Sequence, residues 1–161
     1  MRPASSTLLA LSLFIAATPA SADLPPPKAL NESPWNGDWA LSRTRNAKAI
    51  QDQAAEGYRF HLSPDGAIRW EIPTLGEVVE GRADGQAMRI KRPGADDMTL
   101  AVSPEGPFTL RYTVTRGGQP FGEGRMTLVE YGQAWVDISQ PYGRPDLAHV
   151  VIYVRPRDVD R

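Results

Sequence analysis

The sequence predicts an all-β fold, an antiparallel meander of about eight to ten short strands that closes into a barrel. Two observations lead to this prediction. From Trp35 onward, apolar and polar residues alternate with the period of two that a strand with one buried face requires. Groups of turn-forming residues interrupt the alternation about every ten residues. Closure into a barrel pairs the two edge strands that an open meander would expose.

The first 22 residues have the features of a secretory signal peptide. Arg2 supplies a short positive start, and an apolar run at 8–17 follows it, interrupted only by Ser12. The small residues Ala20-Ser21-Ala22 are those that signal peptidase requires around its cleavage site. We therefore expect cleavage near Ala22 and a periplasmic or secreted protein, with a buried N-terminal helix as the alternative.

A linker and a single domain follow this segment. Residues 23–34 form a Pro-rich linker without periodicity, and the barrel domain is expected to span 35–161. The clearest pair of strands lies at 58–62 and 68–72, on either side of the turn Ser63-Pro64-Asp65-Gly66. By the same criteria we expect strands at 37–43, 77–82, 88–91, 98–102, 110–115, 124–130, 134–139 and 148–155.

One segment departs from the strand pattern. Residues 46–55 are rich in helix formers, and Gly57 follows them as a helix stop. Ala47, Ile50 and Ala54 would share one face of such a helix. We predict a short amphipathic helix over one mouth of the barrel, where it acts as a plug or, alternatively, as a moving gate.

The alternation also predicts which side chains face the barrel interior. Several of them are aromatic, and a barrel of about eight strands is just wide enough to be filled by side chains or to hold one small ligand. The pattern leaves both possibilities open. The residues expected inside include Tyr58, Phe60, Trp70, Ile90, Leu110, Tyr112 and Leu128.

Composition argues against several classes of function. The chain has 161 residues with 18 basic and 19 acidic side chains, and this near-neutral balance is not that of a nucleic-acid-binding protein. The absence of cysteine excludes disulfides, thiolate nucleophiles and cysteine-ligated metals. With only two histidines, far apart in the sequence, we predict no metal site and no cofactor. No apolar run of membrane-spanning length follows the signal peptide, so we expect no transmembrane segment.

The segment Trp35-Asn36-Gly37-Asp38-Trp39-Ala40-Leu41 resembles the Gly-x-Trp start of the first strand in lipocalins and the wider calycin group. In that group the Trp closes one end of the barrel and packs against a basic residue near the last strand. The resemblance therefore implies a structural role in barrel closure for Gly37 and Trp39, with Arg155 as the basic partner through a cation–π contact.

The order of further segments resembles a family of small exported bacterial lipocalin-like proteins, over about residues 36–155. Their first strand reads G-T-W-x-L-N, and their last ends in a Val-Tyr-x-Arg pattern that is similar to Ile152-Tyr153-Val154-Arg155. The resemblance implies a lipocalin-like barrel without specifying an activity. The chain departs from the family in its helical segment at 46–55 and in lacking the lipocalin residues that precede the glycine. Other stretches similar to the family are 83–85, 94–100 and 115–127.

The two histidines are candidates for acid–base chemistry. His61 and Glu71 lie on the charged face of the first hairpin as possible diagonal or near cross-strand neighbours, with an exposed electrostatic pair as the structural alternative. His149 begins the last strand near a barrel rim, where a solvated or capping role is the alternative. We interpret the glycines at 117–118 and 122–124 as strand-turn glycines rather than a phosphate-binding loop.

We predict that the barrel binds a small apolar or amphipathic molecule in its interior or at its mouth. Tyr58, Trp70 and Tyr112 are the expected lining residues, and Arg144, in the loop at 140–146, is the expected rim group. Burial of the ligand's apolar surface would contribute roughly 25 cal/mol per Å².

Two other functions remain open from the sequence. A filled barrel could act through its surface as an inhibitor or interaction module with an envelope protein partner, which a solid core and an exposed apolar patch would favour. A cavity enzyme, an isomerase or hydrolase, would use His61 or Asp137 as its base. It needs a titratable group that points into the barrel, where burial shifts the pKa of that group. The alternation places His61 outward, which counts against that residue.

Overall fold

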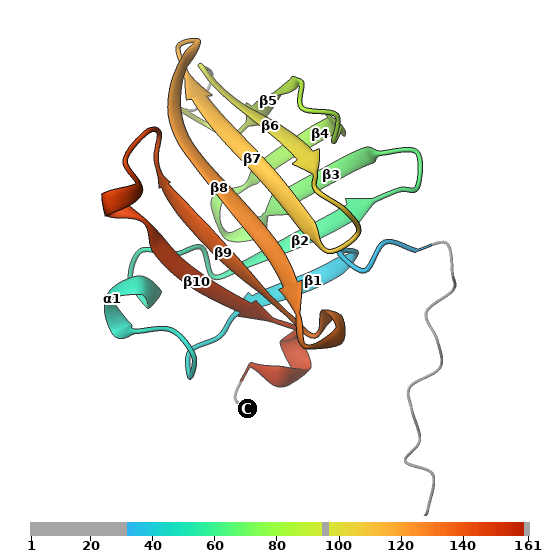
Figure 1. Ribbon diagram of the computed structural model, residues 1–161, viewed down its shortest axis with the longest axis vertical. Coiled ribbons are helices and arrows are strands. Elements are labelled where there is room, and N and C mark those ends of the chain that lie inside the picture. The colour runs from blue at the N-terminus through green and yellow to red at the C-terminus, as the bar shows by residue number, and fades with distance from the viewer. Residues whose placement is uncertain (1–31, 95–96, 160–161) are drawn as a thin grey trace, which may run out of the picture.

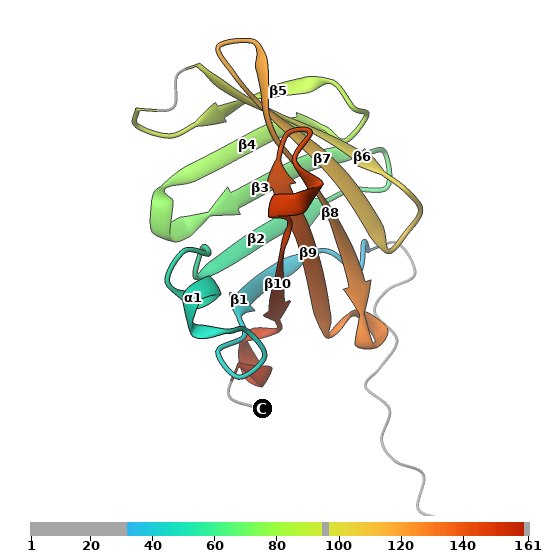
Figure 2. The same ribbon diagram turned by 60° about the vertical axis from the view of Figure 1, so that its left-hand side comes forward.

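The structure, a computed structural model, describes residues 32–94 and 97–159, so the predicted signal peptide at 1–22 and most of the predicted linker lie outside the described residues. Within them, ten antiparallel strands close into one barrel, which confirms the predicted all-β barrel (Figures 1 and 2). Each strand pairs with its neighbour in sequence, and β1 pairs with β10 to complete the circle. The strands are β1 (Gly37–Leu41), β2 (Gly57–Leu62), β3 (Ala67–Ile72), β4 (Glu77–Arg82), β5 (Ala87–Lys91), β6 (Met98–Pro104), β7 (Thr109–Arg116), β8 (Gln119–Val129), β9 (Ala134–Pro141) and β10 (His149–Val154).

The hairpin of β2 and β3 shows how local sequence sets the register. Gly66 has a φ of +85°, which glycine adopts without strain, and its N–H donates to the Ser63 carbonyl at 2.9 Å. This turn places Phe60 opposite Trp70, and both side chains are buried in the barrel. The predicted turn at 63–66 and the strands on either side of it are confirmed.

Aromatic rings fill the middle of the barrel. The Trp135 side chain is fully buried, and its ring neighbours come from β1, β2, β10 and the residues just before β1. These neighbours, with ring centroids 4.4 to 6.4 Å from that of Trp135, are Trp35, Trp39, Tyr58, Phe60 and Tyr153. The residues predicted to face inward are buried, or half-buried against the core in the case of Tyr58 and Tyr112. The interior is therefore filled rather than hollow.

Arg155 closes the barrel at the end opposite the mouth described below. Its guanidinium lies over the Trp39 ring at 3.6 Å from the centroid and donates to the carbonyls of Asn36 at 2.9 Å and Pro34 at 2.8 Å. A Cβ on Gly37 would lie 3.2 Å from this guanidinium, so glycine leaves room for the approach. Burial lowers the pKa of Arg155 to about 10, which keeps it cationic at neutral pH. The structure thus contains the Trp–Arg contact that the resemblance implies.

The helical segment is shorter than the sequence predicts. The prediction was 46–55, whereas α1 spans only Lys48–Gln51. Asn46 explains the difference, because its buried amide donates to the carbonyls of Ser42 and Ile152, both at 2.7 Å, and accepts from the Ile152 N–H at 2.9 Å. The Asn46 side chain thereby pairs with β10 beyond the end of β1, and these hydrogen bonds outweigh the helix propensity of the first residues.

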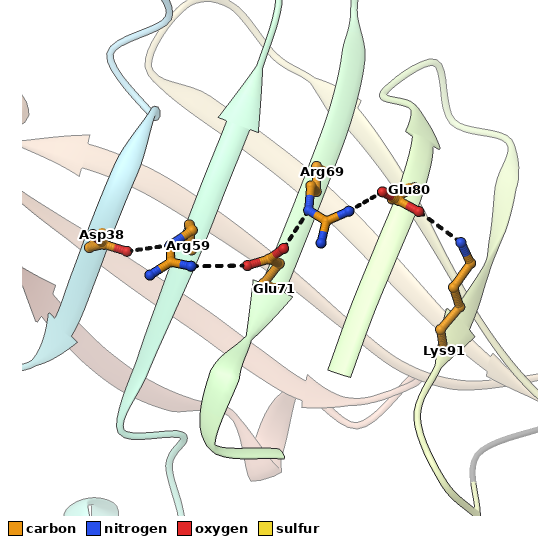
Figure 3. A network of polar contacts seen from close by, with 6 residues as sticks. All are labelled: Asp38, Arg59, Arg69, Glu71, Glu80 and Lys91. Carbon is orange, nitrogen blue, oxygen red and sulfur yellow. Dashed lines mark hydrogen bonds and ion pairs between the residues drawn. The ribbon is translucent and has the colours of Figure 1, made fainter. Parts of the chain in front are cut away.

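The outer face of β1 to β5 carries a chain of alternating charges (Figure 3). Arg59 Nε lies 2.7 Å from Asp38, and Lys91 Nζ lies 2.7 Å from Glu80 at the other end of the chain. Most of these side chains are exposed, so each pair contributes little stability by itself, and we assign the chain a role in fixing strand register. In order across the strands its members are Asp38, Arg59, Glu71, Arg69, Glu80 and Lys91.

Candidate functional site

A pocket of about 330 Å³ opens at one mouth of the barrel. The short helix α1 lies close to the start of β2 and to β10, two strands that contribute to the pocket wall (Figures 1 and 2). The wall combines three tyrosines, one carboxylate and several aliphatic side chains. Its residues are Ile50, Gln53, Ala54, Ala55, Tyr58, Tyr112, Asp137, Ser139, His149, Val151 and Tyr153. We call it the mouth pocket.

The inward faces of β9 and β10 change from apolar to polar toward the mouth. Every second residue faces inward, and the antiparallel register pairs these residues across the two strands. The innermost pair stacks its rings at 4.4 Å, whereas the outermost pair is a hydroxyl and an exposed imidazole 3.1 Å apart. From the core to the mouth the pairs are Trp135 with Tyr153, Asp137 with Val151, and Ser139 with His149.

Tyr112 reaches Asp137 across the strand that separates them. Tyr112 in β7 lies opposite Gly124 in β8, and a Cβ on Gly124 would lie 2.4 Å from the Tyr112 ring. Because that Cβ is absent, the ring lies over β8 and its hydroxyl donates to the carboxylate of Asp137, 3.1 Å from both oxygens. Gly124 lies inside β8, in agreement with the strand predicted at 124–130.

Asp137 is a buried carboxylate with apolar neighbours. It is 7% exposed, and its cross-strand neighbours Met126 and Val151 are both buried. This loss of solvation raises the pKa of Asp137 from 3.8 to about 6, and hydrogen bonds from Tyr112 and Ser139 offset only part of the effect. No lysine or arginine is among the described residues that line the mouth pocket. The carboxylate therefore lacks a cationic partner there.

The tyrosines form the aromatic part of the wall. The Tyr153 hydroxyl donates to the Ala55 carbonyl at 3.1 Å, which ties the segment after α1 to the barrel. The Tyr58 ring meets the Tyr153 ring edge-on, with centroids 5.0 Å apart. Burial raises the pKa of the Tyr58, Tyr112 and Tyr153 hydroxyls, so all three stay protonated at neutral pH and offer hydrogen bonds without charge.

The structure brings together some of the predicted site residues. Tyr58 and Tyr112 line the mouth pocket. Trp70 is buried behind them, with its ring 5.7 Å from that of Tyr112, so it supports the wall without lining it. Arg144 lies outside the pocket, on the exposed connection between β9 and β10, where its guanidinium donates to Asp146 at 2.7 and 2.9 Å. This ion pair holds the Arg144 side chain against its own loop, away from the mouth pocket.

The two bases considered for an enzyme lie on opposite faces of the barrel wall. His61 is exposed on the outer face of β2, opposite Arg69 in β3. Glu71, its proposed partner, lies diagonal to it and forms ion pairs with Arg59 and Arg69 instead (Figure 3). Asp137, by contrast, faces the mouth pocket.

The mouth pocket offers polar recognition and proton exchange. The Asp137 carboxyl, with a pKa of about 6, can take up or release a proton near neutral pH. Ser139 Oγ and His149 Nε2 are 3.1 Å apart, the spacing of a nucleophile and its base. Within the described part of the chain, however, His149 is bonded to Ser139 and to no carboxylate, the contact that orients the base in a catalytic triad. The described residues also contain no group of three or more His, Asp and Glu side chains placed to hold a metal ion.

Sequence reasoning missed Ser139 and Tyr153 as pocket residues and placed His149 only in general terms at a rim. A usable signal was present, because Ser139 follows Trp135 at the spacing that keeps residues on one face of a strand. Which end of the strand is open to solvent, and what lies opposite, depends on the closed register of β9 and β10.

No protein-family model matches the chain, and no curated protein matches it. The closed ten-stranded antiparallel barrel is compatible with a lipocalin-like barrel, and the likeness rests on the fold and on the residues that carry the resemblance. Among residues 32–94 and 97–159, no helix has the length and apolar character needed to cross a membrane.

Proposed function

We propose that this protein is an exported, lipocalin-like barrel that binds a small amphipathic molecule in the mouth pocket. One observation carries the proposal: aromatic and aliphatic walls surround a buried polar end, and the barrel beneath is filled by rings. Because Trp135 and its neighbours occupy the centre, the ligand site is the mouth and not the interior.

The size and lining of the mouth pocket define the ligand class. A volume of about 330 Å³ is at the lower end of the range for small-molecule sites, so the ligand is small. Ile50, Ala54 and Val151 accept its apolar part, and burial of that part drives binding. Asp137 and Ser139 orient its polar part at the inner end.

Native mass spectrometry of the protein purified from its own envelope tests this proposal. We expect a co-purifying small molecule that organic extraction removes, together with a shift in Trp emission, because Trp70 contacts both Tyr58 and Tyr112. A bare mass, with emission unchanged by a panel of lipids, haem and quinones, would contradict the proposal and favour a barrel that acts through its surface.

A pair of variants on β9 locates the binding site. Ser139→Trp places a bulky ring in the mouth pocket, whereas Ile138→Trp places the same ring on the outer face of the same strand, where the side chain is 48% exposed. We expect the first variant to lose the ligand and the second to retain it. Equal retention by both would place the ligand elsewhere.

A second candidate function rests on an exposed apolar patch around β9 and β10. Ile138 and Val150 are outward cross-strand neighbours, and each is about half exposed. A patch of this kind on a filled barrel favours a protein-interaction surface for an envelope partner. The test is cross-linking in the envelope with Ile138→Lys, which should abolish a specific adduct that Ser139→Trp retains. Tyr142 and Leu147, in the same β9–β10 region, and Phe121 in β8 are also about half exposed.

A further inference from the structure

We propose that the ligand of the mouth pocket carries an organic ammonium group, which binds at the Asp137 carboxylate beside the tyrosine side chains that line the pocket. This inference rests on the proposed function and specifies the chemistry of the ligand's polar end. The ligand is then a small cationic amphipath, such as an alkylamine or an alkyl quaternary ammonium compound.

The charge balance of the mouth pocket supports a cationic ligand. Among the described residues, Asp137 is the one charged residue that is buried, and its side chain faces this pocket. The described lining contains no lysine or arginine to neutralise it, and His149 lies exposed at the outer rim. A buried carboxylate without a cationic partner is costly, and an ammonium group from the ligand supplies that partner.

The aromatic composition of the wall supports the same ligand class. Three tyrosine side chains line one small pocket together with the carboxylate. Tyrosine rings attract cations through their negative faces, and clusters of aromatic rings are a recurrent way to bind alkylammonium groups. The Tyr112 hydroxyl already donates to both oxygens of Asp137, which holds the carboxylate in place. Ser139 and His149 at the rim remain for a second polar contact.

The aliphatic residues fit the other end of such a molecule. Ile50 in α1 and Ala54 just after it both line the pocket, and Val151 on β10 lies opposite Asp137 on β9. An alkyl chain attached to the ammonium group would contact these apolar lining side chains. A carboxylate-headed lipid would instead place its negative charge against Asp137, which disfavours that class.

Calorimetric titration of the chain without residues 1–22 tests this inference with probes of matched length. The probes are octyltrimethylammonium, octylamine, octanol and octanoate at pH 8. We expect both ammonium probes to bind at least about tenfold more tightly than octanol, and octanoate to bind most weakly. Asp137→Asn should reduce ammonium affinity to that of octanol and leave octanol affinity within about twofold.

Two further variants separate charge from folding. Asp146→Asn removes an equivalent charge from the exposed β9–β10 connection, outside the pocket, and should leave all four affinities unchanged. Tyr112→Phe removes the hydroxyl that donates to Asp137 but keeps the carboxylate and the ring, so the preference for ammonium should persist. Thermal unfolding verifies that each variant is folded.

The outcomes distinguish the inference from the proposed function. If octylamine and octanol bind equally, and Ser139→Trp blocks both, the ammonium inference is overturned and the proposed function stands. Tightest binding of octanoate would also overturn the inference. An equal loss of all probes in Asp137→Asn would overturn it as well. If no probe binds and none displaces a co-purified molecule, both proposals fail.

Discussion

The charge of Asp137 should lower the stability of the empty barrel, and Asp137→Asn tests this. The substitution keeps the size of the side chain and an oxygen that can accept from the Tyr112 hydroxyl, but it removes the ionisation. In the folded protein burial raises the pKa of Asp137 from 3.8 to about 6. A difference of about two pKa units corresponds to about 3 kcal/mol, at about 1.4 kcal/mol for each unit.

The sign of the effect follows from which state binds the proton more tightly. The folded state has the higher pKa, so it holds the proton where the unfolded state has already lost it, between pH 3.8 and about 6. The contribution of Asp137 to the free energy of unfolding is therefore most favourable below pH 3.8. It falls by about 3 kcal/mol as the pH rises to about 6, and it is constant above that.

Urea unfolding of both proteins between pH 3.5 and 8 measures this contribution. All other titrating groups cancel in the difference between Asp137→Asn and the original protein, because they are common to both. We expect the variant's relative stability to increase by about 3 kcal/mol from the acid to the neutral end of this range. A difference that is constant with pH would contradict this expectation, since Asp137 would then be as well solvated as in the unfolded chain.

Asp146→Asn is the matched control for this experiment. Hydrogen bonds from Arg144 lower the pKa of Asp146, which is exposed, so its contribution to stability is present at neutral pH and lost as the pH falls. The pH dependence of the difference should therefore be weak and of opposite sign. The two carboxylates lie on the same β9–β10 region, which makes the comparison direct.

Three other substitutions test the packing that positions the mouth pocket. Gly124→Ala should displace the Tyr112 ring, and it should therefore destabilise the fold by about 1–3 kcal/mol and abolish ligand binding. Gly122→Ala is the control, because its Cβ would make only an ordinary contact, and it should change neither stability nor binding. Urea unfolding measures the stability and calorimetry measures the binding. Arg155→Lys should cost about 1–3 kcal/mol in the same unfolding assay, because lysine cannot make the two carbonyl hydrogen bonds and the flat ring contact together. Asn46→Ala should cost about 2–4 kcal/mol, because it leaves backbone groups of β10 without partners, and hydrogen exchange in β10 should accelerate. A loss below about 0.5 kcal/mol in either of the last two would contradict the assigned role.

The strands could be predicted because their signals are local. In the hairpin around Gly66, alternation and turn chemistry specify both strands and their register without help from the rest of the chain. The segment at 46–55 had an equally local helix signal, but its outcome depends on Ile152, more than a hundred positions away, through the buried amide of Asn46. Helix propensity is small beside several buried hydrogen bonds, so the distant contact decides.

The site was harder to predict because alternation gives the face of a strand but not the height along the barrel. Tyr58 and Trp70 both face inward, yet only Tyr58 lies high enough to line the mouth pocket. Arg144 lies in the connection between β9 and β10, but the orientation of a loop side chain depends on its nearest partner. Here that partner is Asp146, two residues along the chain.

The position of the mouth pocket follows from the sequence of β9 once the barrel is closed. Trp135 fills the centre, so the next inward position toward the mouth, Asp137, is the first that solvent or a ligand can reach. At this depth the carboxylate is too buried to be well hydrated, and it depends on Tyr112, which reaches it only because β8 carries Gly124 at the crossing point. A purely structural barrel would gain stability from an apolar residue at position 137. A carboxylate held there by the Tyr112 hydroxyl fits the proposed recognition of a cationic ligand group.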